Sequence, residues 1–179
     1  RDIRMLTSDP QRNPSAEVAS AANVSSALRN ATGAEACLAF ITSHGTEAGV
    51  VLRQANGVVR PSALDNALDA GCGTLPTVVV VSACHSGVFL TPAMRQPNRV
   101  VLTAAAADRV SFGCGAGDRF TYYDQCLLQQ FDAATTWGQL AQATRSCVQN
   151  LEKSMGIRTS SQPQIFVGSA VANLRLPGR

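Results

Sequence analysis

The sequence predicts an α/β protein with three layers, in which helices cover both faces of a mostly parallel central sheet. Strand-like and helix-like segments alternate along the chain, which is typical of parallel strands joined by helical crossovers. Thr77 is followed by four valines, and such a strand requires apolar surroundings on both faces. With 179 residues, 45% of them hydrophobic, the chain can bury one core. We therefore predict a single domain over residues 1–179.

The first part of the chain is expected to open with a connection and a short strand over residues 1–6. Ser15 is a candidate N-cap for a helix that runs to Asn30 and closes at Gly33. A strand rich in apolar residues follows over residues 37–42. The short segments after it flank an Asn-Gly pair at positions 56 and 57, which predicts a small β-hairpin.

The middle of the chain is expected to hold a helix and two buried strands. Ser62 is a candidate N-cap for a helix over residues 61–70, because Asp65 follows it by three positions. Apolar runs predict strands over residues 77–82 and 99–106. A loop or short helix is expected between them.

The last third begins with a glycine-rich loop over residues 108–118. Helices are expected over residues 120–131 and 136–155, and Thr136 with Gln139 forms a capping box at the start of the second. Residues 163–168 predict a final strand.

Two of the predicted strands end in residues with reactive side chains. Cys84 follows the valine run in a turn of small residues, and His44 follows the strand over residues 37–42. Ligands and catalytic groups of α/β proteins gather at the carboxyl ends of parallel strands. If the two strands are neighbours, Cys84 and His44 share one cleft. Taken alone, a buried cysteine at a strand end is more often a core residue than a catalyst, and a lone histidine is similarly ambiguous. Together with Gly45 and the Ser-Gly turn after position 84, Cys84 and His44 favour a site.

Composition argues against several other classes of protein. The net charge is +3, and 5% of the residues are aromatic, so neither a basic patch nor a stacking platform for nucleic acid is expected. No apolar run approaches the length of a membrane span, and no membrane contact is expected within this chain. Cofactors are not expected either.

The six cysteines show no paired spacing typical of a zinc site. Cys37 and Cys84 fall on predicted buried strands, where a free cysteine is common. The remaining four lie in predicted loops or helices, and their disulfide pairing stays open, as does the redox compartment. Metal binding through the two histidines and a cysteine is disfavoured for the same reason of spacing.

Two further alternatives are weaker. His85 adjoins Cys84, and neighbouring side chains on an extended backbone point in opposite directions, so His85 is a poor base for that thiol. Glycines 113, 115 and 117 lack the register of a dinucleotide loop and the lysine of a phosphate loop. The rim of a substrate cleft is the favoured interpretation of that loop.

The motifs around the two strand ends resemble those of caspase-like cysteine peptidases. Ser43-His44-Gly45 matches their His-Gly motif, and the run from Ser82 to Gly87 matches Ala-Cys-x-Ser-Gly. Residues 103–105, 111–114, 121–122 and 163–168 make the chain similar to the legumain (C13) family, in particular its bacterial branch. The resemblance covers roughly residues 38–168.

The resemblance implies a caspase-like fold and a Cys84–His44 dyad that cleaves peptide bonds through a thioester. It implies an oxyanion hole formed by the backbone N–H groups of Gly45 and Cys84. A peptide or protein substrate would add as a strand along the loop after the third strand. The residues expected to contact it are Ser43, Ser82, Asp108, Arg109, Val110 and Ser111.

The sequence departs from the family in two respects. Legumains have a glutamate two residues before the catalytic cysteine, where this chain has Ser82. A preference for asparagine before the scissile bond therefore rests on the resemblance alone, and Asp108, Asp118 and Asp124 are the acidic residues near the expected specificity pocket. The first strand and helix of the family fold have no counterpart, and we expect an upstream precursor fragment or a second protomer to complete the sheet.

A cysteine endopeptidase is thus the leading hypothesis. A transpeptidase or amidase that uses the same dyad and a catalytically silent binding module remain alternatives. Export, for example to a periplasm, is favoured over a cytoplasmic location because similar bacterial proteins are often exported.

Overall fold

The computed structural model describes residues 3–29, 33–53, 56–115 and 117–178. Its centre is a four-stranded sheet in the order β3–β7–β8–β9. These strands are β3 (Cys37–Thr42), β7 (Thr77–Ser82), β8 (Arg99–Thr103) and β9 (Gln164–Val167). β3, β7 and β8 are parallel, and β9 is antiparallel to β8. The predicted mostly parallel sheet is confirmed.

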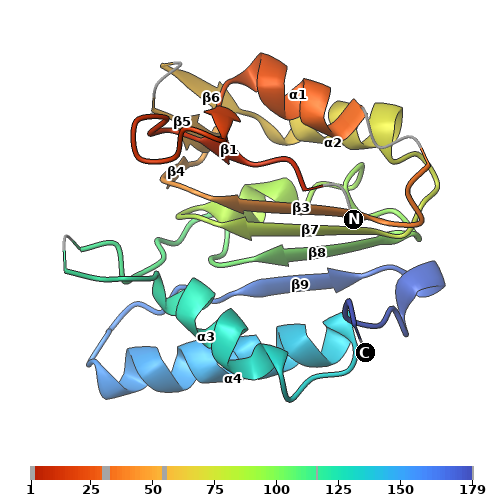
Figure 1. Cartoon of the computed structure of the whole chain (residues 1–179). Coiled ribbons are helices and arrows are strands. Elements are labelled where there is room, and N and C mark those ends of the chain that lie inside the picture. The colour runs from red at the N-terminus through yellow and green to blue at the C-terminus, as the bar shows by residue number, and fades with distance from the viewer. Residues whose placement is uncertain (1–2, 30–32, 54–55, 116, 179) are drawn as a thin grey trace.

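Helices cover both faces of this sheet (Figure 1). One face carries α1 (Ala21–Arg29) and α2 (Pro61–Gly71), and the other carries α3 (Tyr122–Phe131) and α4 (Trp137–Ser154). Every residue of β7 is buried. Val79 and Val81 join the core beneath α2, whereas Val78 and Val80 join the core beneath α3 and α4. The valine run is therefore explained by two apolar layers, and the three-layer prediction is confirmed.

A second, smaller sheet lies beside the carboxyl ends of β3 and β7 (Figure 1). It consists of β4 (Gly45–Thr46), β5 (Gly49–Leu52) and β6 (Gly57–Val59), all antiparallel to their neighbours. Asn56 has a φ of 44°, which asparagine tolerates better than most residues. The predicted hairpin is confirmed, although residues 54 and 55 lie outside the described part.

The amino-terminal prediction was wrong in part. Ser15 does not begin a helix: Glu17–Val18 forms β2, which pairs in parallel with β1 (Leu6–Thr7). The Glu17 N–H donates to the Met5 carbonyl, which holds this segment extended. Helix α1 begins at Ala21, after Ser20 accepts a hydrogen bond from the Asn23 N–H. The predicted end at Asn30 lies outside the described residues.

The N-cap of α2 was also placed wrongly. Arg60 is the N-cap and makes no side-chain cap, while Pro61 occupies the first turn. Proline suits this position because its φ is already helical and it lacks the N–H that would be unsatisfied there.

The capping box of Thr136 and Gln139 at α4 is confirmed. Short 3₁₀ helices follow β7 (η1, Ser86–Phe89) and β9 (η2, Ser169–Val171).

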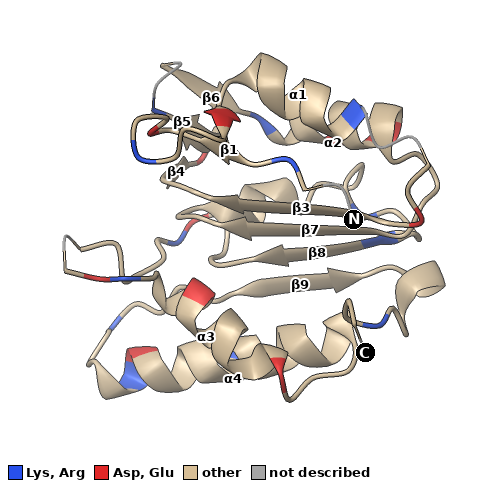
Figure 2. Cartoon of the chain, viewed as in Figure 1, with Lys and Arg blue, Asp and Glu red and all other residues tan. Residues whose placement is uncertain are grey.

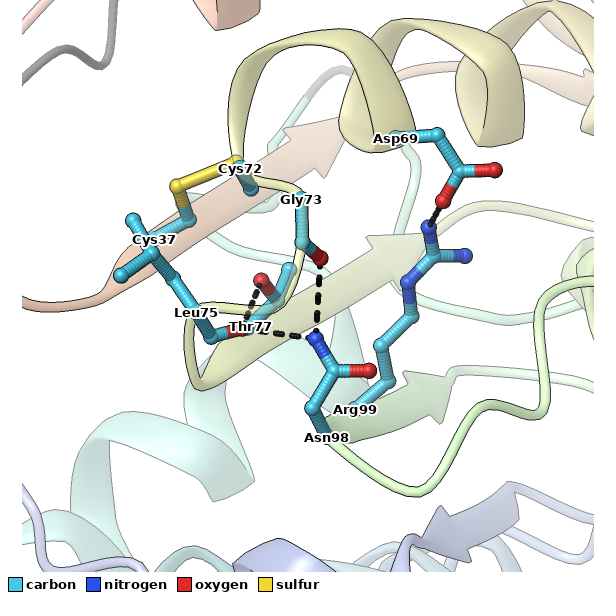
Figure 3. The surroundings of a disulfide bond; sticks show 8 residues. All are labelled: Cys37, Asp69, Cys72, Gly73, Leu75, Thr77, Asn98 and Arg99. Carbon is cyan, nitrogen blue, oxygen red and sulfur yellow. Dashed lines mark hydrogen bonds and ion pairs between the residues drawn. A yellow bond between two sulfur atoms is a disulfide. The ribbon is translucent and has the colours of Figure 1, made fainter.

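Four of the six cysteines form disulfide bonds. Cys37 pairs with Cys72, and Cys126 pairs with Cys147. Reading Cys37 as a free buried cysteine was wrong, because the start of β3 lies next to the end of α2 (Figure 3). The second bridge joins α3 to α4. Cys84 and Cys114 remain free.

Polar links also tie the amino ends of the strands to α2 (Figure 3). The Arg99 side chain at the start of β8 is 1% exposed, and its two terminal nitrogens lie 2.6 Å from carboxylate oxygens of Asp65 and Asp69. The Asn98 amide donates to the carbonyls of Gly73 and Leu75. This end of the sheet is thus fixed by covalent, ionic and hydrogen-bonded contacts.

Charged residues lie mainly on loops and helices, and β3, β7 and β9 carry none (Figure 2). Among the described residues, no helix is both long and apolar enough to cross a membrane.

Candidate active site

The carboxyl ends of β3 and β7 bring the predicted dyad residues to one rim. Thr42 and Ser82 are the last register partners of the two strands, and the Ser43 N–H donates to the Ser82 carbonyl. His44 and Cys84 each follow two residues later. A Cβ added to Gly45 would overlap the carbonyl oxygen of Cys84. The backbone after His44 therefore lies directly against the backbone of Cys84.

The small sheet fixes the backbone around His44. The His44 carbonyl accepts a hydrogen bond of 2.9 Å from the Val51 N–H, and the Ser43 hydroxyl donates to the Val51 carbonyl at 2.8 Å. Ser43 was predicted to contact substrate, but its hydroxyl donates its hydrogen bond to the backbone of the small sheet. The His44 side chain is exposed at the rim.

The Cys84 thiol lies against the segment that follows β8. The Ser111 N–H donates to Sγ at 3.3 Å, and Sγ lies 3.6 Å from the Ser111 carbonyl oxygen and 3.9 Å from its hydroxyl. Cys84 itself is partly exposed.

The turn after Cys84 is fixed to the same segment. His85 has a φ of 56°, its N–H donates to the Arg109 carbonyl at 2.7 Å, and its Nδ1 lies 2.9 Å from the Ala107 carbonyl. A Cβ at Gly87 would overlap the backbone of Ala106 and Ala107. His85 therefore uses a ring nitrogen to hold the turn, and its left-handed backbone shows that the extended conformation assumed in the prediction was wrong.

The remaining predicted contact residues occupy different environments along this segment. Ser111 is buried against Cys84, while Val110 is exposed. Arg109 lies with its Nε 3.5 Å from a carboxylate oxygen of Asp108, whose side chain is 77% exposed. The segment thus presents a free apolar side chain and a charged pair beside the thiol.

A polar cluster of Thr42, Ser82, Thr121 and Asp124 lies at the last residues of β3 and β7, two positions before His44 and Cys84. The hydroxyls of Ser82 and Thr121 are 3.2 Å apart, and Thr121 caps α3 by accepting from the Asp124 N–H. The Thr42 hydroxyl donates to Asp124 Oδ2 at 3.0 Å. The sequence analysis assigned neither Thr42 nor Thr121 to the site, although Thr-x-x-Asp is a known signal for the start of a helix.

Ionisable side chains near the cluster respond to its charges. The pKa of the Cys114 thiol is raised by its partial burial and, in decreasing order, by Cys84, Asp118 and Asp124. Burial, with a smaller contribution from Asp124, raises the pKa of Tyr123 far above its ordinary value. Cys114 therefore lies within electrostatic reach of Cys84 and of both carboxylates.

Two surface hollows, of about 290 and 260 Å³, lie away from this rim, one against Ser169–Leu174 and one between α1 and α2. Within the described part of the chain, no group of three or more potential ligands is placed to hold a metal ion.

Comparison with known proteins agrees with this architecture. The structure of caspase-1 from Spodoptera frugiperda is similar, with a TM-score of 0.59 at 15% identity. The match covers 82% of this chain and 66% of the caspase, so this chain spans just under two thirds of the caspase's length. At this identity the likeness shows the caspase-like fold. No curated protein sequence matches the chain.

The family is shown by sequence. The profile of the Peptidase C13 family matches residues 19–158, which include both strand ends, the polar cluster and all of α4. The resemblance to legumain-like peptidases that the motifs predicted is thereby confirmed. The chain belongs to the Peptidase C13 family.

Proposed function

We propose that this chain is a cysteine endopeptidase that uses Cys84 as nucleophile and His44 as general acid and base. The observation that carries the proposal is the contact of the Gly45 backbone with Cys84 at the shared rim of β3 and β7. Membership of the Peptidase C13 family supports cysteine peptidase chemistry in general. Thiol and imidazole are the groups that such acyl transfer requires.

In the acylation step, the Cys84 thiol gives its proton to His44, and its sulfur attacks the carbonyl carbon of the scissile bond. The negative charge that forms on the carbonyl oxygen would be stabilised by the backbone N–H groups of Gly45 and Cys84. The carbon–nitrogen bond then breaks as His44 gives a proton to the leaving amine. A thioester on Cys84 results.

In the deacylation step, His44 takes a proton from water, which attacks the thioester. The carbon–sulfur bond breaks, and the carboxylate product leaves with Cys84 restored. An amine in place of water would give a new amide instead, so a transpeptidase or amidase shares every residue of this scheme. The mass of the products formed from a peptide with an added amine distinguishes the two reactions.

The segment over residues 109–111 would align the substrate. Its backbone already contacts His85 and Cys84, and a peptide paired with it would pass the sulfur in an extended conformation. The Val110 side chain is exposed beside this path. The resemblance to legumains carries a preference for asparagine before the scissile bond, but Ser82 offers no carboxylate to support it.

Cleavage of a mixed peptide library and labelling with iodoacetamide test the proposal together. Cys84→Ala and His44→Ala should each abolish cleavage, and Cys84→Ala should also remove the label from that position. Cys114→Ala, which removes the other free thiol, is the matched control and should retain turnover. Turnover by Cys84→Ala would exclude this mechanism. Normal labelling of Cys84 with no cleavage of any peptide would favour a silent binding module.

Two further proposals concern the compartment in which the protein is located and an additional strand of the sheet. Two disulfide bonds support export to an oxidising compartment.

We also propose that a further strand, from a precursor fragment or a second protomer, pairs with the edge of β3, where Leu38 and Phe40 are 53% and 47% exposed. Hydrogen exchange of the longer precursor should then show protected amides in β3, and fast exchange there would contradict this pairing.

A further inference from the structure

The segment that follows β8, over residues 104–111, is held from two sides. One side is the reactive turn, where the His85 N–H donates to the Arg109 carbonyl at 2.7 Å. On the other side, the Ala106 N–H donates to the Ser161 carbonyl at 2.8 Å. Ser161 therefore supports the segment from the side away from the reactive turn.

Ser161 belongs to the loop between α4 and β9, which lies at the carboxyl end of β8 (Figure 1). It is 1% exposed, whereas residues 158–160 before it are partly or fully exposed. Gln162 after it has a φ of 54°, a left-handed conformation that residues other than glycine rarely adopt. Such a backbone persists only where its surroundings enforce it. The loop therefore requires an anchor close to Ser161.

Glu152, near the carboxyl end of α4, provides this anchor. It is 2% exposed, and its Oε1 accepts a hydrogen bond of 3.0 Å from the Ser161 N–H, nine positions later in the chain. The Glu152 carbonyl also accepts from the Ile157 N–H at 2.9 Å. Both ends of the loop segment that leads to Ser161 are thus attached to one residue of α4.

The Glu152 carboxylate is costly to bury. Its Oε2 is buried as well and has no hydrogen-bond partner, and no ion pair reaches Glu152 among the described residues. A buried acceptor without a donor lowers stability, and glutamate is rarely buried unless it is paired. An apolar residue would fill the same space without this cost. The hydrogen bond to the Ser161 backbone is therefore the contribution that requires a carboxylate here.

Hydrogen bonds continue from Ser161 to the reactive turn. Ala106, which donates to Ser161, accepts at its own carbonyl from the Arg109 N–H at 3.1 Å. The Arg109 carbonyl accepts in turn from His85, the neighbour of Cys84. All these bonds join backbone atoms, so a shift of Ser161 would displace the peptide groups that fix the turn.

We propose that Glu152 is a positioning residue for Cys84: it fixes the Ser161 backbone, which fixes the segment over residues 104–111 and with it the reactive turn. The inference rests on the proposed peptidase function and adds a residue that acts on the reaction only through other residues. It assigns the buried carboxylate to the geometry of the nucleophile rather than to the stability of α4.

Replacement of Glu152 by side chains of similar shape tests the inference. Glu152→Met removes both oxygens, and kcat for peptide cleavage by the folded protein should fall at least about 10-fold, because small displacements of reacting groups reduce rates strongly. Glu152→Gln keeps an acceptor for the Ser161 N–H and should restore kcat to within about threefold of the parent. Val148→Ala, one turn earlier on the buried face of α4, is the matched control. It should lower the unfolding midpoint by creating a cavity but leave kcat unchanged.

Amide hydrogen exchange follows the same contacts without any need for turnover. In Glu152→Met, the amides of Ser161, Ala106 and His85 should exchange at least about 10-fold faster than in the parent, relative to amides in the centre of β7. If Glu152→Met does not fold, Glu152→Asp takes its place. It withdraws the carboxylate by one methylene and should speed exchange at the same three amides.

The possible failures are distinguishable. An unchanged kcat in Glu152→Met, or a loss of kcat in Glu152→Gln as large as that in Glu152→Met, would overturn the role of Glu152 and leave the peptidase intact. Faster exchange confined to Ser161, with Ala106 and His85 protected as in the parent, would overturn it as well. Absence of cleavage by the parent protein would instead overturn the proposed function, and hydrogen exchange would then decide alone whether Glu152 positions the turn.

Discussion

The two ends of the central sheet are built from different kinds of contact. At the amino end, a disulfide joins β3 to α2, and the buried Arg99 joins β8 to two carboxylates of α2. At the carboxyl end, small residues and backbone hydrogen bonds hold the strand ends together, and a free thiol and an imidazole remain at the surface. One end is closed by strong links, and the other keeps its reactive groups accessible.

This difference suggests a division of labour. A rim that carries chemistry needs side chains with unfilled bonding capacity, such as Cys84 and His44, and unfilled capacity lowers stability. The opposite rim can supply the compensating stability because the proposed substrate path lies at the carboxyl end. Substitutions at the amino end should therefore change the free energy of unfolding, whereas substitutions at the carboxyl end should change activity.

The largest effect is expected from Arg99→Met at the amino end. It leaves Asp65 buried without its partner, and breaking a buried ion pair in this way costs about 3 to 5 kcal/mol. Urea unfolding should show this loss, while kcat of the folded fraction stays near that of the parent. Arg95→Met, on the exposed turn nearby, should change the unfolding free energy by less than about 0.5 kcal/mol. A fall in kcat without a loss of stability would break the proposed division.

Removal of the amino-end disulfide should have a slightly smaller effect. The bridge spans 35 residues, and replacing both Cys37 and Cys72 by alanine should lower the free energy of unfolding by about 3 kcal/mol, mainly through the unfolded chain. Replacing Cys126 and Cys147, which span 21 residues on the other helical layer, provides a comparison. Equal stability with and without a reductant in the parent protein would contradict this expectation.

At the carboxyl end, Gly45→Ala should mainly affect activity. Its Cβ cannot coexist with the Cys84 carbonyl, so the backbone of the proposed nucleophile must shift. Displacements of about 1 Å can cost roughly 100-fold in rate. Gly138→Ala provides the control, because a Cβ there meets little and alanine is the better helix former. The kcat for peptide cleavage, read beside the unfolding midpoint, separates the two effects. Equal activity of both variants would show that the close approach at Gly45 is unimportant.

Much of the fold could be predicted because its elements carry local signals. The valine run, the Asn-Gly turn and the capping box of α4 each specify their structure through neighbouring residues. The two apolar strands also predicted that His44 and Cys84 lie at one rim, because the carboxyl ends of neighbouring parallel strands meet at the same edge of a sheet. Ser15 shows the limit: its cap signal was overridden by the pairing of β2 with β1, whose register partners lie eleven positions earlier in the chain.

The polar cluster could not be assembled from sequence alone. Asp124 was a candidate, but nothing in the sequence separated it from Asp108 and Asp118, because burial depends on how α3 packs against the strand ends. Thr42 contacts it across 82 positions of the chain. Disulfide pairing has the same character, since Cys37 and Cys72 meet only after β3 and α2 have packed.

The smallest effect concerns Cys114, the second free thiol at the open rim. Partial burial, Cys84, Asp118 and Asp124 raise its pKa, in that order, so less of it is thiolate at a given pH. Its alkylation by iodoacetamide should therefore be slow at pH 8 and should keep rising with pH after an ordinary peptide thiol has levelled off. Cys84→Ala should lower the pKa and speed the reaction of Cys114, and Asp118→Asn should do so to a lesser extent. Peptide mass mapping without reductant follows Cys114 separately from Cys84. If neither variant changes its rate, the charges of the open rim do not reach Cys114, and its slow reaction reflects burial alone.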